Sequence, residues 1–203
     1  MIELLLLQSP IDNGNIAEVY LNNALKEFCE TTRMVKKTSM FIITMEGLDQ
    51  TVKIDGLLAI RDIFDEKGVK LDSTAMPSYL QAGNGYWYVK ESGGEYPLIE
   101  IGYWNGTDKQ AFDVDREFYI EYDASVEFVH TKSGGEKDYS KPPPVGERWH
   151  DVILARACEK ANFSNPNLRR YYYAIWNDGM KRAKAAAREM STNSSYNMKV
   201  FEL

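Results

Sequence analysis

The chain has 203 residues, of which 44% are hydrophobic and 27% are charged, an ordinary composition for a soluble globular protein. Its net charge of −6 at pH 7 and its pI near 5.1 argue against a protein that binds nucleic acid over a broad surface. No apolar run approaches the roughly 20 residues that a membrane-spanning helix requires, so we expect no membrane partner.

The N-terminal part of the chain combines an apolar run with a helical pattern. Residues 1–7 are apolar except Glu3, but they lack the basic residues that open a signal peptide, so we expect a terminal strand or docking arm. A helix is predicted from about residue 16 to residue 31, because apolar residues recur there at steps of three and four. This apolar face consists of Ala17, Leu21, Ala24, Leu25 and Phe28.

Cys29 and Cys158 both fall in predicted helices with apolar neighbours. Two such cysteines are more typical of buried thiols than of a disulfide, and nothing in the pattern indicates export. We therefore expect a protein that is made in the cytoplasm.

Residues 33–146 contain several short strand-like segments separated by turns rich in glycine and asparagine. We predict a hairpin between residues 39–44 and 50–54, which flank Gly47. Short strands are also predicted at residues 60–64 and 69–71.

The later strands of this region carry stronger signals. A hairpin is predicted between residues 86–89 and 98–103, because Ser92-Gly93-Gly94 between them favours a turn. Residues 118–130 are predicted to form one strand with a buried face and an exposed face. The alternation is carried by Phe118, Ile120 and Tyr122.

Two further helices are predicted after a polar, Gly- and Pro-rich loop at residues 132–146. Asn165-Pro166 favours the start of the second helix, since Asn caps free amides and Pro is tolerated at the first helical position. The apolar face of the first helix consists of Trp149, Val152, Ile153, Ala157 and Ala161. That of the second consists of Leu168, Tyr172, Ile175, Gly179, Ala183, Ala186 and Met190, whose small members indicate the close approach of another helix.

These elements predict an α+β fold in which the N-terminal helix and the C-terminal helical pair form a bundle. The β-rich region, with a sandwich-like arrangement, is predicted to be inserted between them. The expected divisions are an arm and first helix at 1–32, the insertion at 33–146, the helical pair at 147–192, and a C-terminal arm at 193–203.

The C-terminal helical pair is a candidate partner-binding surface. Basic residues outnumber acidic ones between residues 147 and 192, although the whole chain is acidic. A solvated basic face explains this pattern, and so does a surface for an acidic partner. Three consecutive tyrosines at 171–173 cannot all face one core, so at least one faces a partner or the insertion. The candidates are Arg169, Arg170, Tyr171, Tyr173, Lys181 and Arg182.

The C-terminal arm supplies further candidates. Tyr196, Met198 and Val200 alternate with polar or charged residues, which is the pattern of an added edge strand, although a frayed terminus has the same composition. Phe201 and Leu203 complete this candidate segment.

The sequence offers little catalytic chemistry. Its two histidines, His130 and His150, lack the neighbouring ligands of a metal site, and no nucleotide-binding or nucleophile motif occurs. Two pairs of close carboxylates, Asp113 with Asp115 and Glu121 with Asp123, are interpreted as solvent-facing. We predict no enzyme, no metal and no cofactor.

Aromatic residues crowd the central strands, where they form either a core and contact rim or a platform that stacks on sugars. The residues concerned are Tyr86, Trp87, Tyr88, Tyr96, Tyr103 and Trp104. The platform defines the alternative function, a virion module that binds a glycan or a receptor.

Four segments together resemble the head–tail adaptor proteins of tailed phages. They are the opening helix ALKEFCETT at 24–32, the turn MPSY at 76–79, the strand FYIEY at 118–122, and the return to the helices ERWHD at 147–151. Their order covers nearly the whole chain.

The resemblance implies a structural subunit of the phage neck, at the head–tail junction of the virion. Members of the family form a ring of about twelve copies that joins the portal protein to a tail hub or nozzle protein. Genomic DNA passes through such a ring without sequence-specific binding, and an acidic lumen would let it slide.

Overall fold

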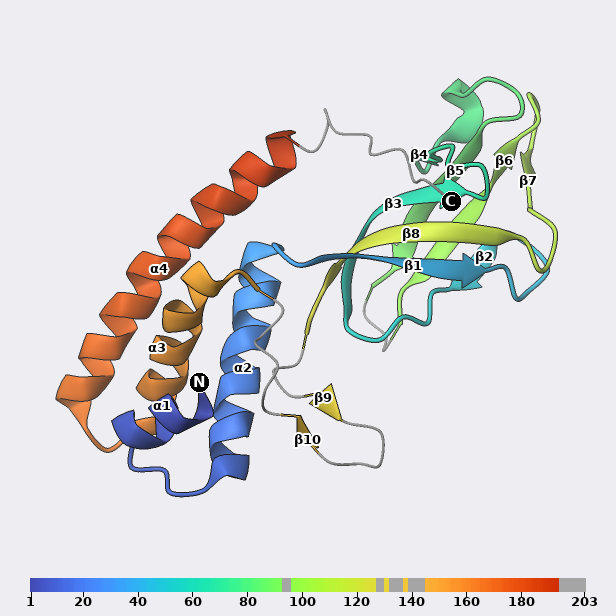
Figure 1. Ribbon diagram of the computed structural model, residues 1–203. Helices are drawn as coiled ribbons and strands as arrows, with labels where there is room; N and C mark the ends of the chain where they lie inside the picture. The colour runs from blue at the N-terminus through green and yellow to red at the C-terminus, as the bar shows by residue number, and fades with distance from the viewer. Residues whose placement is uncertain (93–95, 127–129, 132–136, 139–144, 194–203) are drawn as a thin grey trace. The chain divides into compact units, whose positions relative to one another are not determined.

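The computed structural model describes the chain except for residues 93–95, 127–129, 132–136, 139–144 and 194–203. It divides into two compact units (Figure 1). The helical unit contains residues 1–35 and 125–203, and the β unit contains residues 36–124. The predicted mixed α+β class is confirmed, since both helices and sheets are present. The predicted insertion ended at residue 146, whereas the β unit ends at Ala124.

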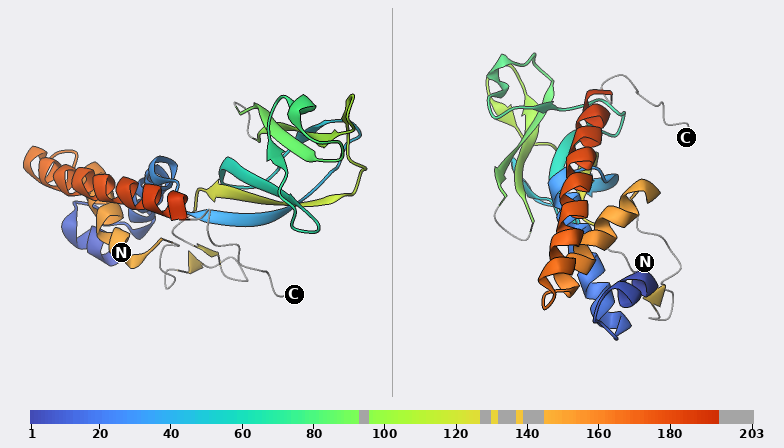
Figure 2. Two further views of the ribbon diagram at one scale, coloured as in Figure 1. Left: turned by 90° about the horizontal axis from the view of Figure 1, so that it is seen from above. Right: turned by 90° about the vertical axis from the view of Figure 1, so that its left-hand side faces the viewer.

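The helical unit is built from α1 (Ile2–Gln8), α2 (Gly14–Thr32), the short 3-10 turn η2 (Glu147–Trp149), α3 (His150–Ala161) and α4 (Pro166–Asn193). Helix α3 packs against both α2 and α4, so segments far apart in sequence share one core. The C-terminal turns of α4 extend past the N-terminal start of α3 (Figures 1 and 2). Fully buried side chains of this core include Leu21, Leu25, Phe28, Ile153, Ala157 and Ala183.

The expected N-terminal strand is wrong, because Ile2–Gln8 forms helix α1. Its four consecutive leucines are good helix formers without a branched Cβ. Leu5 is fully buried where α1 contacts α2 and α3, and this packing stabilises so short a helix.

The predicted helix at 16–31 is confirmed as α2, and its termini explain its limits. The Asn13 side chain accepts a hydrogen bond from the Asn15 N–H at 2.8 Å, which caps the N-terminus. Arg33 adopts a left-handed conformation with φ 54° and donates its N–H to the Cys29 carbonyl, which ends the helix.

The β unit contains two sheets. In the first, β8 (Glu117–Ala124) lies between β1 (Lys36–Ile42) and β3 (Leu57–Asp65), all antiparallel. The second has the order β2-β6-β5-β4, with β7 also paired to β6. Its strands are β2 (Asp49–Thr51), β4 (Asp72–Ser73), β5 (Gly85–Glu91), β6 (Leu98–Trp104) and β7 (Lys109–Gln110), and the 3-10 turn η1 (Pro77–Tyr79) follows β4.

The two sheets of the β unit are linked by an aromatic cluster around Phe112. The Phe112 ring lies 4.9 Å from that of Phe118 in β8 and 5.5 Å from that of Tyr103 in β6. The predicted alternation in β8 is confirmed, since Phe118, Ile120 and Tyr122 are buried.

The predicted hairpin around Gly47 is wrong, because β1 pairs with β8 and β2 pairs with β6 in the other sheet. The buried Gln50 side chain makes the hydrogen bonds to residues 44 and 45 that backbone groups would make in such a hairpin. Its amide oxygen accepts the N–H groups of Thr44 and Met45, and its amide nitrogen donates to the Met45 carbonyl at 2.7 Å. The predicted hairpin of β5 and β6 is confirmed.

The strand predicted at 118–130 is too long, because β8 ends at Ala124. Both of its neighbours begin there: Lys36 of β1 lies opposite Asp123, and Leu57 of β3 lies opposite Ala124. A strand cannot continue without a partner for its backbone groups. Further along the chain, β9 (His130–Thr131) pairs with β10 (Lys137–Asp138). Strand β9 lies just before the segment 132–146 that was expected to be a loop, and β10 lies inside it.

A buried polar cluster surrounds Glu100 on β6. Its carboxylate accepts hydrogen bonds from the hydroxyls of Tyr86 at 3.0 Å and Tyr88 at 2.8 Å, and from Lys109 Nζ at 2.6 Å. Burial disfavours the charged carboxylate, but the bonds from Lys109 and the two tyrosines outweigh it and lower the pKa of Glu100. Glu100 is therefore a buried anion whose charge is stabilised by the hydrogen bonds from Tyr86, Tyr88 and Lys109.

Cys29 and Cys158 are confirmed as buried thiols that are not joined in a disulfide. Burial raises the pKa of Cys158 to about 11, so very little thiolate exists at pH 8. We expect no reaction of the folded protein with Ellman's reagent at pH 8, and release of two equivalents of chromophore once urea unfolds it. Rapid labelling of the native protein would contradict the burial of the Cys29 and Cys158 thiols.

Candidate interaction site on the helical unit

Three helices meet at a chain of alternating charges. Arg156 on α3 donates to Glu27 on α2 through Nε at 2.8 Å and through Nη2 at 2.5 Å. It also donates through Nη1 to Glu159 at 2.8 Å, and Glu159 accepts from Arg169 Nε on α4 at 2.9 Å. The Glu159 side chain is only 4% exposed, and both arginines donate hydrogen bonds to its carboxylate.

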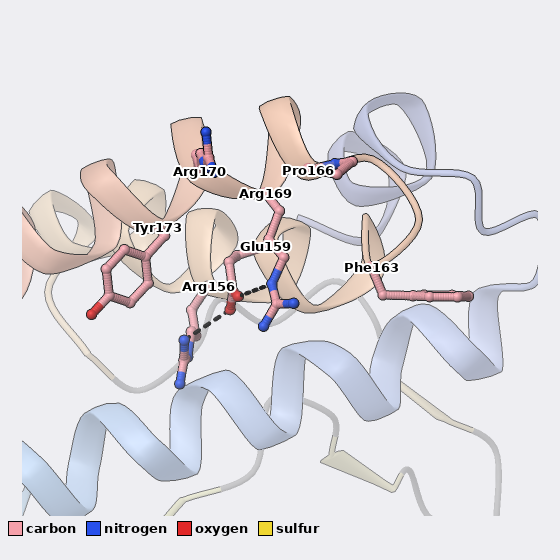
Figure 3. Close-up of a pocket in the computed structure, with 7 residues that line it drawn as sticks. All are labelled: Arg156, Glu159, Phe163, Pro166, Arg169, Arg170 and Tyr173. Carbon is pink, nitrogen blue, oxygen red and sulfur yellow. Dashed lines mark hydrogen bonds and ion pairs between the residues drawn. The ribbon is translucent and has the colours of Figure 1, made fainter.

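A surface hollow lies over this charge chain, and we call it the arginine hollow. It is lined by Arg156, Glu159, Phe163, Pro166, Arg169, Arg170 and Tyr173. Figure 3 shows Arg156, Glu159 and Arg169 in a row, with Phe163 and Tyr173 to either side. Phe163 is 72% exposed and Tyr173 52% exposed, so the sides of the hollow are aromatic and open to a partner.

The turn between α3 and α4 positions these residues. The Asn162 side chain donates to the Cys158 carbonyl at 2.9 Å and to the Gln8 carbonyl at 3.0 Å, which fixes the end of α3. Asn165 then accepts the N–H groups of Asn167 and Leu168, both at 3.2 Å, and Pro166 opens α4. The predicted helix start at Asn165-Pro166 is confirmed.

The predicted apolar face of α4 is only partly correct. Gly179 and Ala183 are buried as expected, but Leu168 and Met190 are exposed. The buried face instead includes Trp176 and Met180. It is narrower than predicted and rotated, because the buried positions of α4 lie between Trp176 and Ala183.

The predicted close approach at the small residues is confirmed at Gly179. A Cβ added there would lie 2.6 Å from Val152 Cγ1 on α3 and closer still to Val152 Cγ2. Glycine is therefore required by contact with α3, and this contact sets the spacing of the helices beneath the hollow.

The structure brings some of the predicted site residues together and separates others. Arg169, Arg170 and Tyr173 all line the arginine hollow. Tyr171 and Arg182 are also exposed, but their helical positions place them on a different face of α4.

Two exposed faces of α4 therefore carry predicted site residues. Lys181 lies eleven residues after Arg170, which is about three turns, and so continues the face of the hollow. On the other face, Arg182 forms an ion pair with Asp178 at 3.2 Å. Tyr196, Met198, Val200, Phe201 and Leu203 lie outside the described residues.

Sequence reasoning missed Arg156, Glu159 and Phe163. Arg156 and Glu159 have the spacing of a helical ion pair, but the partner that orders Arg156 is Glu27, 129 residues away. The exposed position of Phe163 could not be inferred, since an aromatic residue after a helix usually signals packing.

The other candidate residues lie in less accessible or isolated positions. Trp87 is 3% exposed, so this one residue of the predicted aromatic platform cannot stack on a sugar. Asp123 is buried and forms an ion pair with Arg61, whereas Asp113 and Asp115 are exposed. His150 Nε2 lies 3.1 Å from the Val145 carbonyl, which fits a packing role.

Within the described ranges, no three His, Cys, Asp or Glu side chains are grouped as a metal site would require. In the same part of the chain, no helix combines the length and apolar character needed to cross a membrane. The sequence matches no protein-family model and no curated protein.

Proposed function

We propose that this protein is a structural subunit of the neck of a tailed phage, where copies form a ring that joins the portal to the tail. The observation that carries the proposal is the arginine hollow, an ordered and exposed surface of arginine and aromatic residues on the helical unit. Arginine and aromatic side chains are the residues most enriched where proteins bind one another.

The order of the elements supports the same function. Helix α2, the strands of residues 36–124, a long return segment and the pair α3 and α4 follow one another as in the head–tail adaptors that the sequence resembles. In this proposal the β unit is a sandwich-like insertion into a helical bundle, and the bundle faces the neighbouring copies of the chain in the ring.

The proposed partners follow from this role. They are the portal protein, a tail hub or nozzle protein, and about twelve copies of the chain itself, in a virion assembled in the host bacterial cytoplasm. The net charge of −6 suits a channel wall, since like charge keeps the passing DNA from adhering.

Binding to the portal tests the proposal directly. The purified chain is mixed with the portal ring encoded by the same genome, and the product is weighed by native mass spectrometry. We expect one copy of the chain for each portal subunit, because a neck ring must match the symmetry it is built on. A portal from an unrelated phage is the control and should stay bare. If the cognate portal also stays bare across salt and protein concentrations, the neck function is wrong.

A chain truncated after Thr192 shows which part of the protein binds the portal and so anchors it. Loss of portal binding would assign the anchor to the C-terminal arm, and retained binding would assign it to the remaining surfaces.

A further inference from the structure

The arginine hollow, together with the charged residues next to it, carries more positive charge than its carboxylates neutralise. Four cations, Arg156, Lys160, Arg169 and Arg170, surround the two anions Glu27 and Glu159. Arg156 donates to Glu27 and Glu159 through all three nitrogens of its guanidinium, whereas Arg169 donates to Glu159 through Nε. The terminal nitrogens of Arg169 and the exposed Arg170 therefore favour an anionic group in the hollow.

The aromatic sides of the hollow define its ligand further. Phe163 and Tyr173 are more than half exposed and lie on either side of Arg169 (Figure 3). A ligand that carries both carboxylates and aliphatic side chains would satisfy the arginines and cover these rings at once.

The β unit presents a surface with this chemistry, which we call the acidic tip. It is formed by two adjacent turns, since Ile43 donates its N–H to the Arg116 carbonyl at 3.0 Å and accepts the Asp115 N–H at 2.9 Å. Its exposed residues are Met45, Glu46, Asp113, Val114, Asp115 and Glu117.

The acidic tip is also ordered from within. Gln50 holds the turn at residues 44–47 through the four hydrogen bonds of its side-chain amide. Arg116, the one cation in the second turn, stacks over Phe112 at 4.5 Å from the ring centroid instead of extending over the acids. A surface ordered in this way loses little conformational entropy when it binds.

We propose that the arginine hollow of one copy binds the acidic tip of a second copy. The two surfaces differ, so the contact is head-to-tail and continues from copy to copy until the ring closes. The inference rests on the proposed function by giving its ring a subunit interface, but it concerns self-association alone.

A charge exchange in trans tests this contact. The hollow variant is Arg170→Glu with Tyr173→Glu, two exposed positions on α4 where glutamate is a good helix former and where Glu159 keeps both its arginines. The tip variant is Glu46→Lys with Asp113→Lys.

The matched control makes the same chemical change on another face of α4. It is Tyr171→Glu with Arg182→Glu, which alters the charge by as much as the hollow variant does.

Self-association is measured by sedimentation velocity without portal, at low salt and protein concentrations up to 1 mM. We expect the wild type and the control to associate, and each of the two other variants to lose at least about tenfold in association constant, because like charges then face each other. An equimolar mixture of the hollow and tip variants should recover association as 1:1 pairs.

Several results would overturn the inference. They are a wild type that stays monomeric at 1 mM, a hollow variant that associates like the wild type, and a mixture that does not recover. If a 20-base-pair DNA duplex binds and the hollow variant loses that binding but not self-association, the hollow is a nucleic-acid site instead. Portal binding can fail while self-association succeeds, so the two proposals are separable.

Discussion

Replacing Glu100 with alanine should lower the free energy of unfolding by about 3–5 kcal/mol, the cost of breaking a buried, fully hydrogen-bonded charge cluster. The change leaves the buried Tyr86 hydroxyl without its acceptor and Lys109 without its counter-ion. Urea unfolding followed by tryptophan fluorescence measures the loss, since Trp87 lies in the neighbouring strand. Glu91→Ala, an exposed carboxylate on β5, is the control and should change stability by less than about 0.5 kcal/mol.

The same cluster predicts a dependence on pH. The folded pKa of Glu100 lies below its ordinary value of 4.5, so its charge stabilises the fold fully above that value. This stabilisation is lost as the pH falls from 4.5 through the lower folded pKa. Glu100→Gln cannot lose it, so the stability of that variant should fall less steeply than that of the wild type below pH 4.5. If the free energy of unfolding falls equally steeply with decreasing pH in the wild type and in Glu100→Gln, Glu100 is not a buried anion.

Gly179→Ala should also destabilise the protein, although alanine is the better helix former. The added Cβ would meet both methyl groups of Val152, and overpacking of this kind costs about 1–3 kcal/mol against a gain of about 1 kcal/mol in helix propensity. We expect a net loss of up to about 2 kcal/mol in chemical denaturation. Gly14→Ala is the matched control, because a Cβ at Gly14 meets nothing within 4 Å.

A double-mutant cycle shows whether Val152 is the cause. In the Val152→Ala background the space beside Gly179 opens, so Gly179→Ala should become neutral or stabilising. If the two changes are simply additive, the helices do not approach each other at this point.

The sequence was informative where one segment determines its own structure. The apolar period of residues 17–28 predicted α2, and Asn165-Pro166 predicted the start of α4. These signals are local, since a helix makes its hydrogen bonds within itself. The mixed α+β class followed from such segments.

Pairings between distant segments could not be predicted from the sequence. Nothing local to residues 39–44 indicates that β1 pairs with β8 instead of β2, because the alternation in a strand indicates which of its faces is buried but not which strand lies beside it. The candidate site has the same limit: its arginines at 169 and 170 were identified from charge, but Arg156 is ordered by Glu27 of a distant helix. Helix α1 was missed because a short run of leucines also suits a strand, and its packing decided the outcome.

The register of β1 and β8 has a consequence for how the chain folds. Lys36 and Asp123, at the two ends of the β unit, lie directly opposite each other. Between α2 and α3 lie 117 residues (33–149), but once the β unit has formed, only the 28 of them outside residues 36–124 remain to be closed into a loop. Loop closure then costs about 1.3 kcal/mol less, which makes the meeting of α2 and α3 about tenfold more favourable. Early formation of the β unit therefore promotes assembly of the helical unit, and mutations that weaken β1–β8 pairing should slow the folding of helices that they never touch.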